Sequence, residues 1–126
     1  MYFPESTQYY RDDFSNSFDD RDKALFMHEM THVWQYQLGY AVKRHGLTVS
    51  SQGMDAYRYT LNGNGTISDY NMEQQGEIIS DYFIICIIGN PQRVWISGHA
   101  TKDPALLAST VDSLLNDPHN NKHLPT

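Results

Sequence analysis

Cysteine is nearly absent from this chain, whose 126 residues contain a single one, Cys86. One cysteine cannot form an intrachain disulfide, and the chain has no Cys-x-x-Cys pair of the kind that closes many structural zinc sites. Cys86 lies within an apolar run, where a cysteine is typically a small core residue. The composition therefore argues against a disulfide scaffold and against a thiolate-type structural metal site.

Positive charge is scarce as well. Nine Lys and Arg residues stand against 15 Asp and Glu, the formal net charge is −6, and the Lys and Arg residues do not cluster. Nucleic acids and anionic membranes are recognised through clustered positive charge. Both are therefore poor candidates for the partner of this protein.

Long apolar segments are also missing, and no leader sequence is expected. The apolar run Tyr82–Ile88 is far too short to span a bilayer. The first residues, Met1–Ser6, carry neither the basic region nor the apolar region of a secretory signal peptide. If the protein acts outside its cell, we expect another component to carry it.

What the chain does contain suits one domain, residues 1–126. It is 40% apolar and 13% aromatic, enough for a modest core. Nine tyrosines are many for this length. Because tyrosine is half apolar and half hydrogen-bonding, it suits clefts and binding surfaces.

The strongest pattern is His28-Glu29-Met30-Thr31-His32, an H-E-x-x-H. In an α-helix the two histidines lie about 40° apart on one face, one turn from each other. Imidazoles so placed can bind one tetrahedral zinc ion, and Glu29 stands beside them, where a carboxylate can take a proton from a zinc-bound water. The pattern predicts His28 and His32 as metal ligands and Glu29 as the general base, although so short a pattern also arises by chance.

The surrounding residues predict a helix over about 20–38. Asp19 or Asp20 can cap its start, and Gly39 can end it. Apolar side chains on the arc opposite the histidines are expected to pack against the core: Phe26, Met27, Met30, Val33, Trp34 and Leu38. Apolar residues cover most of the circumference, which predicts a largely buried helix. A buried histidine pair needs a partner, and a metal is the simplest one.

A second long helix is predicted over about 71–88, capped by Asp69 or Asn71 and ended by Gly89. Three carboxylates recur on it at one-turn spacing and share a stripe that continues into isoleucines: Glu73, Glu77 and Asp81, then Ile84 and Ile88. Carboxylates at the head of an apolar stripe are costly unless they are exposed or paired. Solvent exposure is one explanation, but the H-E-x-x-H upstream favours a metal.

The remaining segments predict shorter elements. Residues 1–18 are expected to form an extended arm with a short strand around 1–3, and Gly39 and Gly46 interrupt the segment after the first helix. Residues 56–61 alternate with period two and predict a strand, which the turn at 62–65 can pair with 66–67 in a small β-hairpin.

The C-terminal part predicts a third helix and a tail. Asp103 and Pro104 form a helix start, and an amphipathic stripe runs to about Asn116. Residues 118–126 are expected to form a loose tail whose histidines, His119 and His123, are bystanders. The predicted fold is mainly α, or α+β, with the H-E-x-x-H helix, a second Glu-bearing helix, a C-terminal helix and a short β-hairpin.

Residues Gly76–Asp81 resemble the gluzincin signature Asn-Glu-x-x-Ser-Asp, with Gly76 in place of the asparagine. The resemblance implies a small zincin-like fold in which Glu77 is the third zinc ligand. It also implies that Asp81 accepts a hydrogen bond from the His28 imidazole and orients it, a role that raises the basicity of the ligand. Glu73, one turn earlier, is the alternative ligand.

A longer resemblance covers three blocks: 26–35, Gly39-Tyr40 and 71–75. These blocks look like the metallopeptidase domains attached to type VI secretion spike (VgrG) and Rhs-type proteins. The resemblance implies a bacterial toxin or effector domain, made in the cytoplasm, exported by a specialised secretion system to a target cell, and matched by a spike or Rhs carrier and a cognate inhibitor.

The expected function is zinc-dependent hydrolysis of peptide bonds, with Glu29 moving the proton from water to the leaving amine. A further donor should stabilise the tetrahedral oxyanion. The candidates are Tyr57, Tyr59, Tyr70 and His99, of which Tyr59 is favoured. Two alternatives remain open: a zinc amidase acting on peptidoglycan, and a binding module whose metal site is catalytically silent. At 14.5 kDa we expect a shallow or open groove, closed by the 40–70 segment.

Overall fold

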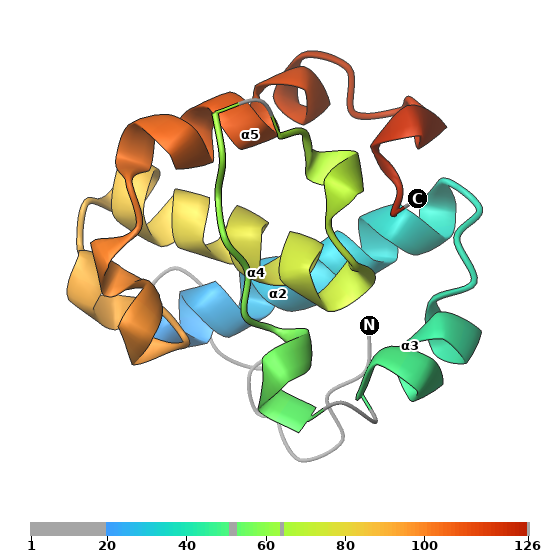
Figure 1. Cartoon of the computed structure of the whole chain (residues 1–126), viewed down its shortest axis with the longest axis horizontal. Coiled ribbons are helices and arrows are strands. Elements are labelled where there is room, and N and C mark those ends of the chain that lie inside the picture. Colours follow the sequence, from blue (N-terminus) through green and yellow to red (C-terminus); the bar gives the residue numbers. More distant parts are fainter. Residues whose placement is uncertain (1–19, 51–52, 64, 126) are drawn as a thin grey trace, which may run out of the picture.

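Three helices form the framework: α2 (Asp20–Gln37), α4 (Met72–Tyr82) and α5 (Pro104–Asn116). The computed structural model describes residues 20–50, 53–63 and 65–125. Helix α4 lies between α2 and α5, and its contact with α2 is the most extensive of the fold (Figure 1). A fourth helix, α3 (Val42–Ser50), packs against α2 and α4.

Short helical turns connect these helices. Helix α4 continues into a π-helical segment, Phe83–Ile88. The 3-10 turns are Gly53–Ala56, Ile67–Asp69, Pro91–Arg93, Ser97–Thr101 and Asn121–His123. None of the described helices is both long and apolar enough to cross a membrane.

Local signals set the helix ends as predicted. The Asn71 side chain accepts a hydrogen bond from the Gln74 backbone N–H at 2.7 Å and caps α4. Asp103 caps α5, with Pro104 in its first turn. Gly39 and Gly89, which follow α2 and the π-helical segment, have φ values of 99° and 81°, which few side chains tolerate. The predicted helices over 20–38, 71–88 and 104–116 are thereby confirmed in outline.

Helix α3 was not predicted, because Gly46 reads as a break. In the structure Gly46 faces α4, and a Cβ built on it would lie 3.7 Å from the methyl carbon of Met72. The glycine is thus a point of close packing within a helix. Tertiary contact has overridden its low helix propensity.

The β-hairpin predicted over 56–67 does not form, and no strand occurs among the described residues. Its backbone carbonyls are occupied by side chains from elsewhere instead of by a partner strand. Those of Ala56, Arg58, Tyr59 and Thr60 accept from Asn71, Gln74, Lys102 and Tyr70, respectively. An isolated two-stranded ribbon is marginally stable, so these contacts decide the conformation. The strand expected at 1–3 and the arm at 1–18 lie outside the described residues.

The apolar core lies between α4 and α5. Its buried members include Ile78, Ile84, Leu107, Val111 and Leu114. Helix α2 presents a different face to α4: its buried residues are Ala24, His28, Thr31 and Gln35. The apolar arc of α2 that was expected to pack on the core is only partly buried. The reason is that α4 offers α2 carboxylates, a glycine and a serine, which suit polar partners.

The C-terminal segment is held to the body, in contrast to the predicted loose tail. The Gln75 amide donates to the backbone carbonyl of His123 at 2.8 Å, and the Trp34 indole N–H donates to that of Pro118 at 2.6 Å. His123 is buried, and its Nε2 lies 2.8 Å from the carbonyl oxygen of Asp117. The segment thus closes over the C-terminal half of α2 (Figure 1).

Candidate metal centre

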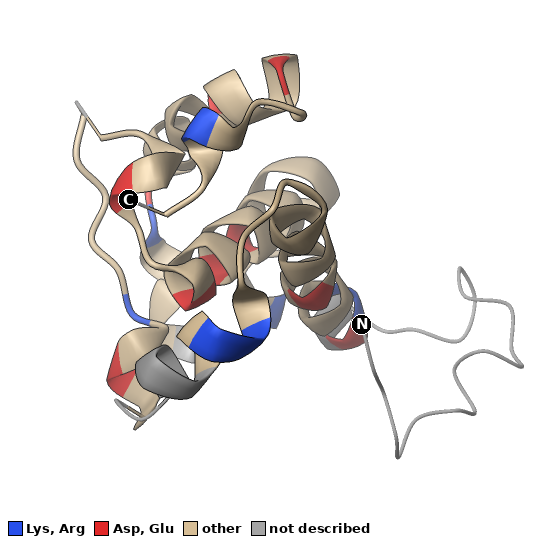
Figure 2. Ribbon diagram, turned by 90° about the vertical axis from the view of Figure 1, so that its right-hand side faces the viewer, with Lys and Arg blue, Asp and Glu red and all other residues tan. Residues whose placement is uncertain are grey.

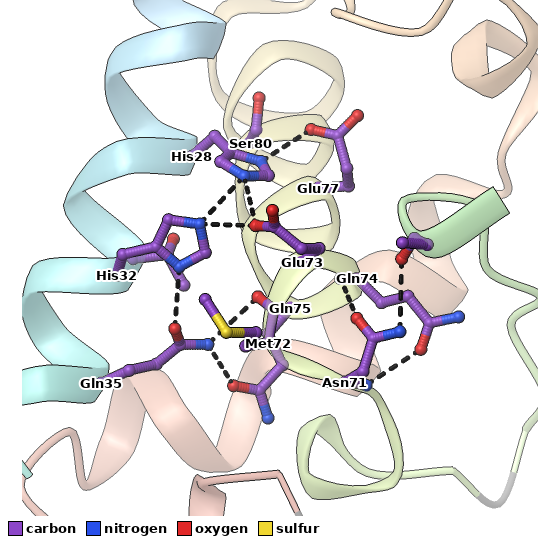
Figure 3. A network of polar contacts seen from close by, with 12 residues as sticks. His28, His32, Gln35, Asn71, Met72, Glu73, Gln74, Gln75, Glu77 and Ser80 are labelled. Carbon is purple, nitrogen blue, oxygen red and sulfur yellow. Dashed lines mark hydrogen bonds and ion pairs between the residues drawn. The ribbon is translucent and has the colours of Figure 1, made fainter. Parts of the chain in front are cut away.

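Two histidines of α2 meet two carboxylates of α4 where these helices pack together (Figure 3). The Nε2 atoms of His28 and His32 lie 3.1 Å apart, because one helical turn separates the residues. Glu73 Oε1 lies 2.6 Å from His32 Nε2 and 3.1 Å from His28 Nε2. The structure thus brings His28, His32 and Glu73 together, with donor atoms all within 4.8 Å of one another.

This donor set fits a divalent cation. Two imidazole nitrogens and one carboxylate oxygen are a typical set for zinc that keeps a position open. Tetrahedral zinc separates its ligand atoms by roughly 3.3 Å. The three atoms lie 2.6–3.1 Å apart. Only a small spreading of the cluster is therefore needed to admit an ion.

The electrostatics of the cluster also favour a cation. Burial alone would lower the pKa of His28, but the adjacent carboxylates of Glu73 and Glu77 outweigh it and raise that pKa to about 9. Burial likewise opposes ionisation of Glu73, yet its hydrogen bonds to His28 and His32 hold its pKa well below the usual range. The buried carboxylates are thus stabilised by positive charge nearby, which either protons on the imidazoles or a bound metal ion can supply.

Glu77, the predicted third ligand, contacts the other nitrogen of His28. Its Oε2 lies 2.9 Å from His28 Nδ1, and its side chain is fully buried. Its second oxygen, Oε1, has no hydrogen-bond partner in the described part of the chain. A carboxylate at Nδ1 fixes the tautomer and the orientation of a ligand imidazole. Glu77 thus stands where Asp81 was expected.

Asp81 forms no hydrogen bond with His28, the residue that it was predicted to orient. Its Oδ2 accepts a hydrogen bond from the Tyr59 hydroxyl and lies 2.8 Å from His99 Nδ1. The α2–α4 contact continues instead through Ser80, whose hydroxyl donates to the Ala24 carbonyl at 2.9 Å. Asp81, one residue further round the helix, therefore faces Tyr59 and His99. Burial raises its pKa.

Gly76, the departure from the gluzincin signature, has a steric explanation. A Cβ built on it would lie 2.8 Å from the Cε1 and Nδ1 atoms of His28, closer than real contacts allow. The imidazole thus occupies the space that a side chain at position 76 would need. Glycine here lets α4 approach the first histidine closely.

Two glutamines, neither of them among the predicted site residues, support the second histidine. Gln35 Oε1 lies 2.9 Å from His32 Nδ1, and its amide nitrogen donates to Met72 O and Gln75 Oε1. Gln75 in turn donates to the backbone carbonyls of Ile67 and His123. Gln35 lies three residues after His32 on the same helix, a spacing that could have suggested the contact. Figure 3 shows the chain of contacts from His32 through Gln35 to Gln75. The Gln75 contact with His123 then ties the His32 imidazole to the C-terminal segment.

Glu29 lies at the junction of two pockets. One, of about 310 Å³, is also lined by His28, Glu73 and Tyr57. The other, of about 780 Å³, is also lined by His32 and by residues of the 40–70 segment. Glu29 is half-buried and lines both pockets, one of them beside His28 and the other beside His32. A general base in an H-E-x-x-H site needs such a position.

The tyrosines divide between this site and the protein interior. Tyr59, the favoured oxyanion donor, is buried with Asp81, and burial raises the pKa of its hydroxyl far above the usual range. Tyr57 lines the smaller pocket, with its ring centroid 5.8 Å from that of His28. Burial and the neighbouring Glu73 raise the pKa of Tyr57 to about 12, so its hydroxyl stays protonated and can donate. Tyr70 and His99 pack around Tyr59.

Comparison with known proteins gives one partial relative. The chain is 46% identical over 65 residues to the type VI secretion system spike protein VgrG2b of Pseudomonas aeruginosa. The match covers 49% of this chain and only 6% of the spike protein. No protein-family model and no solved structure matches the chain.

Proposed function

We propose that this chain is a zinc-dependent peptidase domain. The observation that carries the proposal is the convergence of His28 Nε2, His32 Nε2 and Glu73 Oε1 beside Glu29, which lines both adjoining pockets. A structural metal site needs no neighbouring base and no open pocket. The combination of a ligand set, a base and two adjoining pockets favours hydrolysis.

In this proposal His28, His32 and Glu73 hold the metal, while Glu77 and Gln35 orient the two imidazoles through their Nδ1 atoms. Zinc bound there would act as a Lewis acid that makes water nucleophilic near neutral pH and polarises a carbonyl. Glu29 accepts the proton of that water and returns it to the nitrogen of the leaving amine.

Tyr57, rather than Tyr59, is proposed as the hydroxyl that donates to the developing oxyanion. Tyr57→Phe is expected to lower kcat by about 10²-fold, the scale of losing one such donor, with little change in KM. Tyr59→Phe removes the hydroxyl bound to Asp81 and should act mainly on the thermal midpoint. The pair is compared by peptide-hydrolysis kinetics and thermal unfolding. An unchanged kcat in Tyr57→Phe, with zinc bound, would remove Tyr57 from the mechanism.

The partial relative supports a setting for this activity. We infer that the domain serves as a bacterial effector delivered with a type VI secretion spike, since half of the chain is similar to part of such a spike protein. The alternative carrier is a Rhs-type protein, to which the same domain would be attached in place of the spike protein. A cognate inhibitor in the producing cell follows from that setting, because a peptidase made in the cytoplasm would otherwise act there.

The test is hydrolysis by the purified full chain before and after metal removal. Unstructured casein-type peptides and purified peptidoglycan are offered in parallel, and cleavage is followed by mass spectrometry. We expect peptide cleavage that a chelator abolishes and that stoichiometric zinc restores. Cleavage of peptidoglycan alone would make the domain an amidase, and zinc binding without any hydrolysis would make it a binding module.

A further inference from the structure

We propose that the pocket between α2 and the start of α3 binds a substrate side chain next to the scissile bond, and that it selects a bulky apolar residue with an acidic neighbour. The inference rests on the proposed peptidase function and adds a substrate class to it. We call this hollow the α2–α3 pocket. It is lined by residues 29, 32, 33 and 36 of α2 and by residues 41–44.

The walls of the α2–α3 pocket are mainly apolar. Val33 and Tyr36 contribute one side, and Ala41 and Val42 contribute the other. The Tyr36 side chain is 72% exposed, a large ring left on the surface at the edge of the pocket. The volume of about 780 Å³ exceeds that of any single side chain. Such a hollow suits a bulky apolar residue together with its neighbours.

The position of the pocket links it to the reaction. Glu29 lines both the α2–α3 pocket and the smaller pocket, whose lining also includes His28, Tyr57 and Trp95. A substrate chain that passes over Glu29 therefore has one pocket on each side of it. The bond next to the base is the one to be cleaved, so the two pockets hold the residues on either side of that bond.

The charge at the rim gives the second part of the specificity. Lys43 and Arg44 are exposed and form no ion pair with any described residue. They lie in the first turn of α3, where positive charge opposes the helix dipole, so helix stability does not account for them. In Figure 2, Lys and Arg positions are blue, and α3 faces the viewer. In a chain of net charge −6, this rim attracts a carboxylate.

The experiment is a cleavage-site profile on a library of proteome-derived peptides, read by mass spectrometry. The zinc-loaded wild type is compared with Lys43→Glu/Arg44→Glu, and Glu29→Gln is the blank. Arg93→Glu/Lys122→Glu is the matched control, because it changes the net charge equally at exposed positions outside the pocket. We expect wild-type sites rich in bulky apolar residues with Asp or Glu within two positions. Reversal at 43 and 44 should reduce the acidic preference about tenfold, and the control should not.

A binding measurement separates specificity from turnover. A fluorescein-labelled peptide containing Phe-Glu should bind the zinc-loaded Glu29→Gln protein about tenfold more weakly once positions 43 and 44 are reversed. Wild-type cleavage without this preference, or a preference that survives the reversal, would overturn the assignment of the pocket and leave the peptidase function standing. Absence of wild-type cleavage above the blank would overturn the peptidase function itself.

Discussion

Glu29→Gln is expected to lower peptide hydrolysis by about 10²–10⁴-fold, the contribution typical of a positioned general base. The amide keeps the size of the side chain but cannot take a proton. The Glu29 side chain forms no hydrogen bond or ion pair with another described residue, so the thermal midpoint should stay unchanged. Steady-state kinetics on zinc-loaded protein, with metal content measured on the same sample, give the result.

The matched control is Asp112→Asn, which removes an exposed carboxylate on α5 that belongs neither to the histidine cluster nor to the lining of either pocket. It should hydrolyse peptides at the wild-type rate. If Glu29→Gln binds zinc fully and also retains the wild-type rate, then Glu29 is not the base. In that case hydrolysis depends on another group, and the role given to the H-E-x-x-H motif is wrong.

Glu73→Gln is expected to lose the zinc that the wild type holds at about one ion per chain. Glu73 Oε1 is the oxygen that lies within hydrogen-bond distance of the Nε2 atoms of both His28 and His32. A neutral amide at this position is a poor zinc ligand. Glu77→Gln should bind zinc about 10–100-fold more weakly, because its amide can still accept at His28 Nδ1 but adds no charge. Elemental mass spectrometry and competition with a chelating dye measure both values.

Comparing Glu73→Gln with Glu77→Gln also decides which of the two carboxylates is the zinc ligand. Both side chains are buried and both substitutions conserve volume, so they form a matched pair. Zinc that survives Glu73→Gln but is lost in Glu77→Gln would make Glu77 the ligand, as the gluzincin resemblance implies. Its Oε1, which lacks a hydrogen-bond partner in the described part of the chain, would then be the coordinating oxygen. His32→Ala should lose the metal in either case.

The sequence by itself determined the features that depend only on residues close together in the chain, which are helix periodicity and helix ends. Helical geometry alone puts His28 and His32 one turn apart and Glu29 beside them. Caps and stops are equally local, so Asn71, Asp103 and Gly39 mark helix ends that agree with the structure. The mainly helical class followed from these signals. The predicted hairpin does not form, because a short strand depends on hydrogen bonds to a partner strand. Side chains from other segments occupy the backbone carbonyls of this segment instead.

Only the tertiary structure decided which residues meet across the α2–α4 interface. Glu73, Glu77 and Asp81 share one face of α4, so a sequence cannot tell which turn lies opposite the histidines. The longitudinal register is set by distant contacts, such as Ser80 with Ala24 and the close approach of Gly76 to His28. A shift of one turn leaves every helical pattern intact yet exchanges the carboxylate at the metal-binding atoms. The physical reason is that helix periodicity is local, whereas register depends on the packing of residues about 50 positions apart.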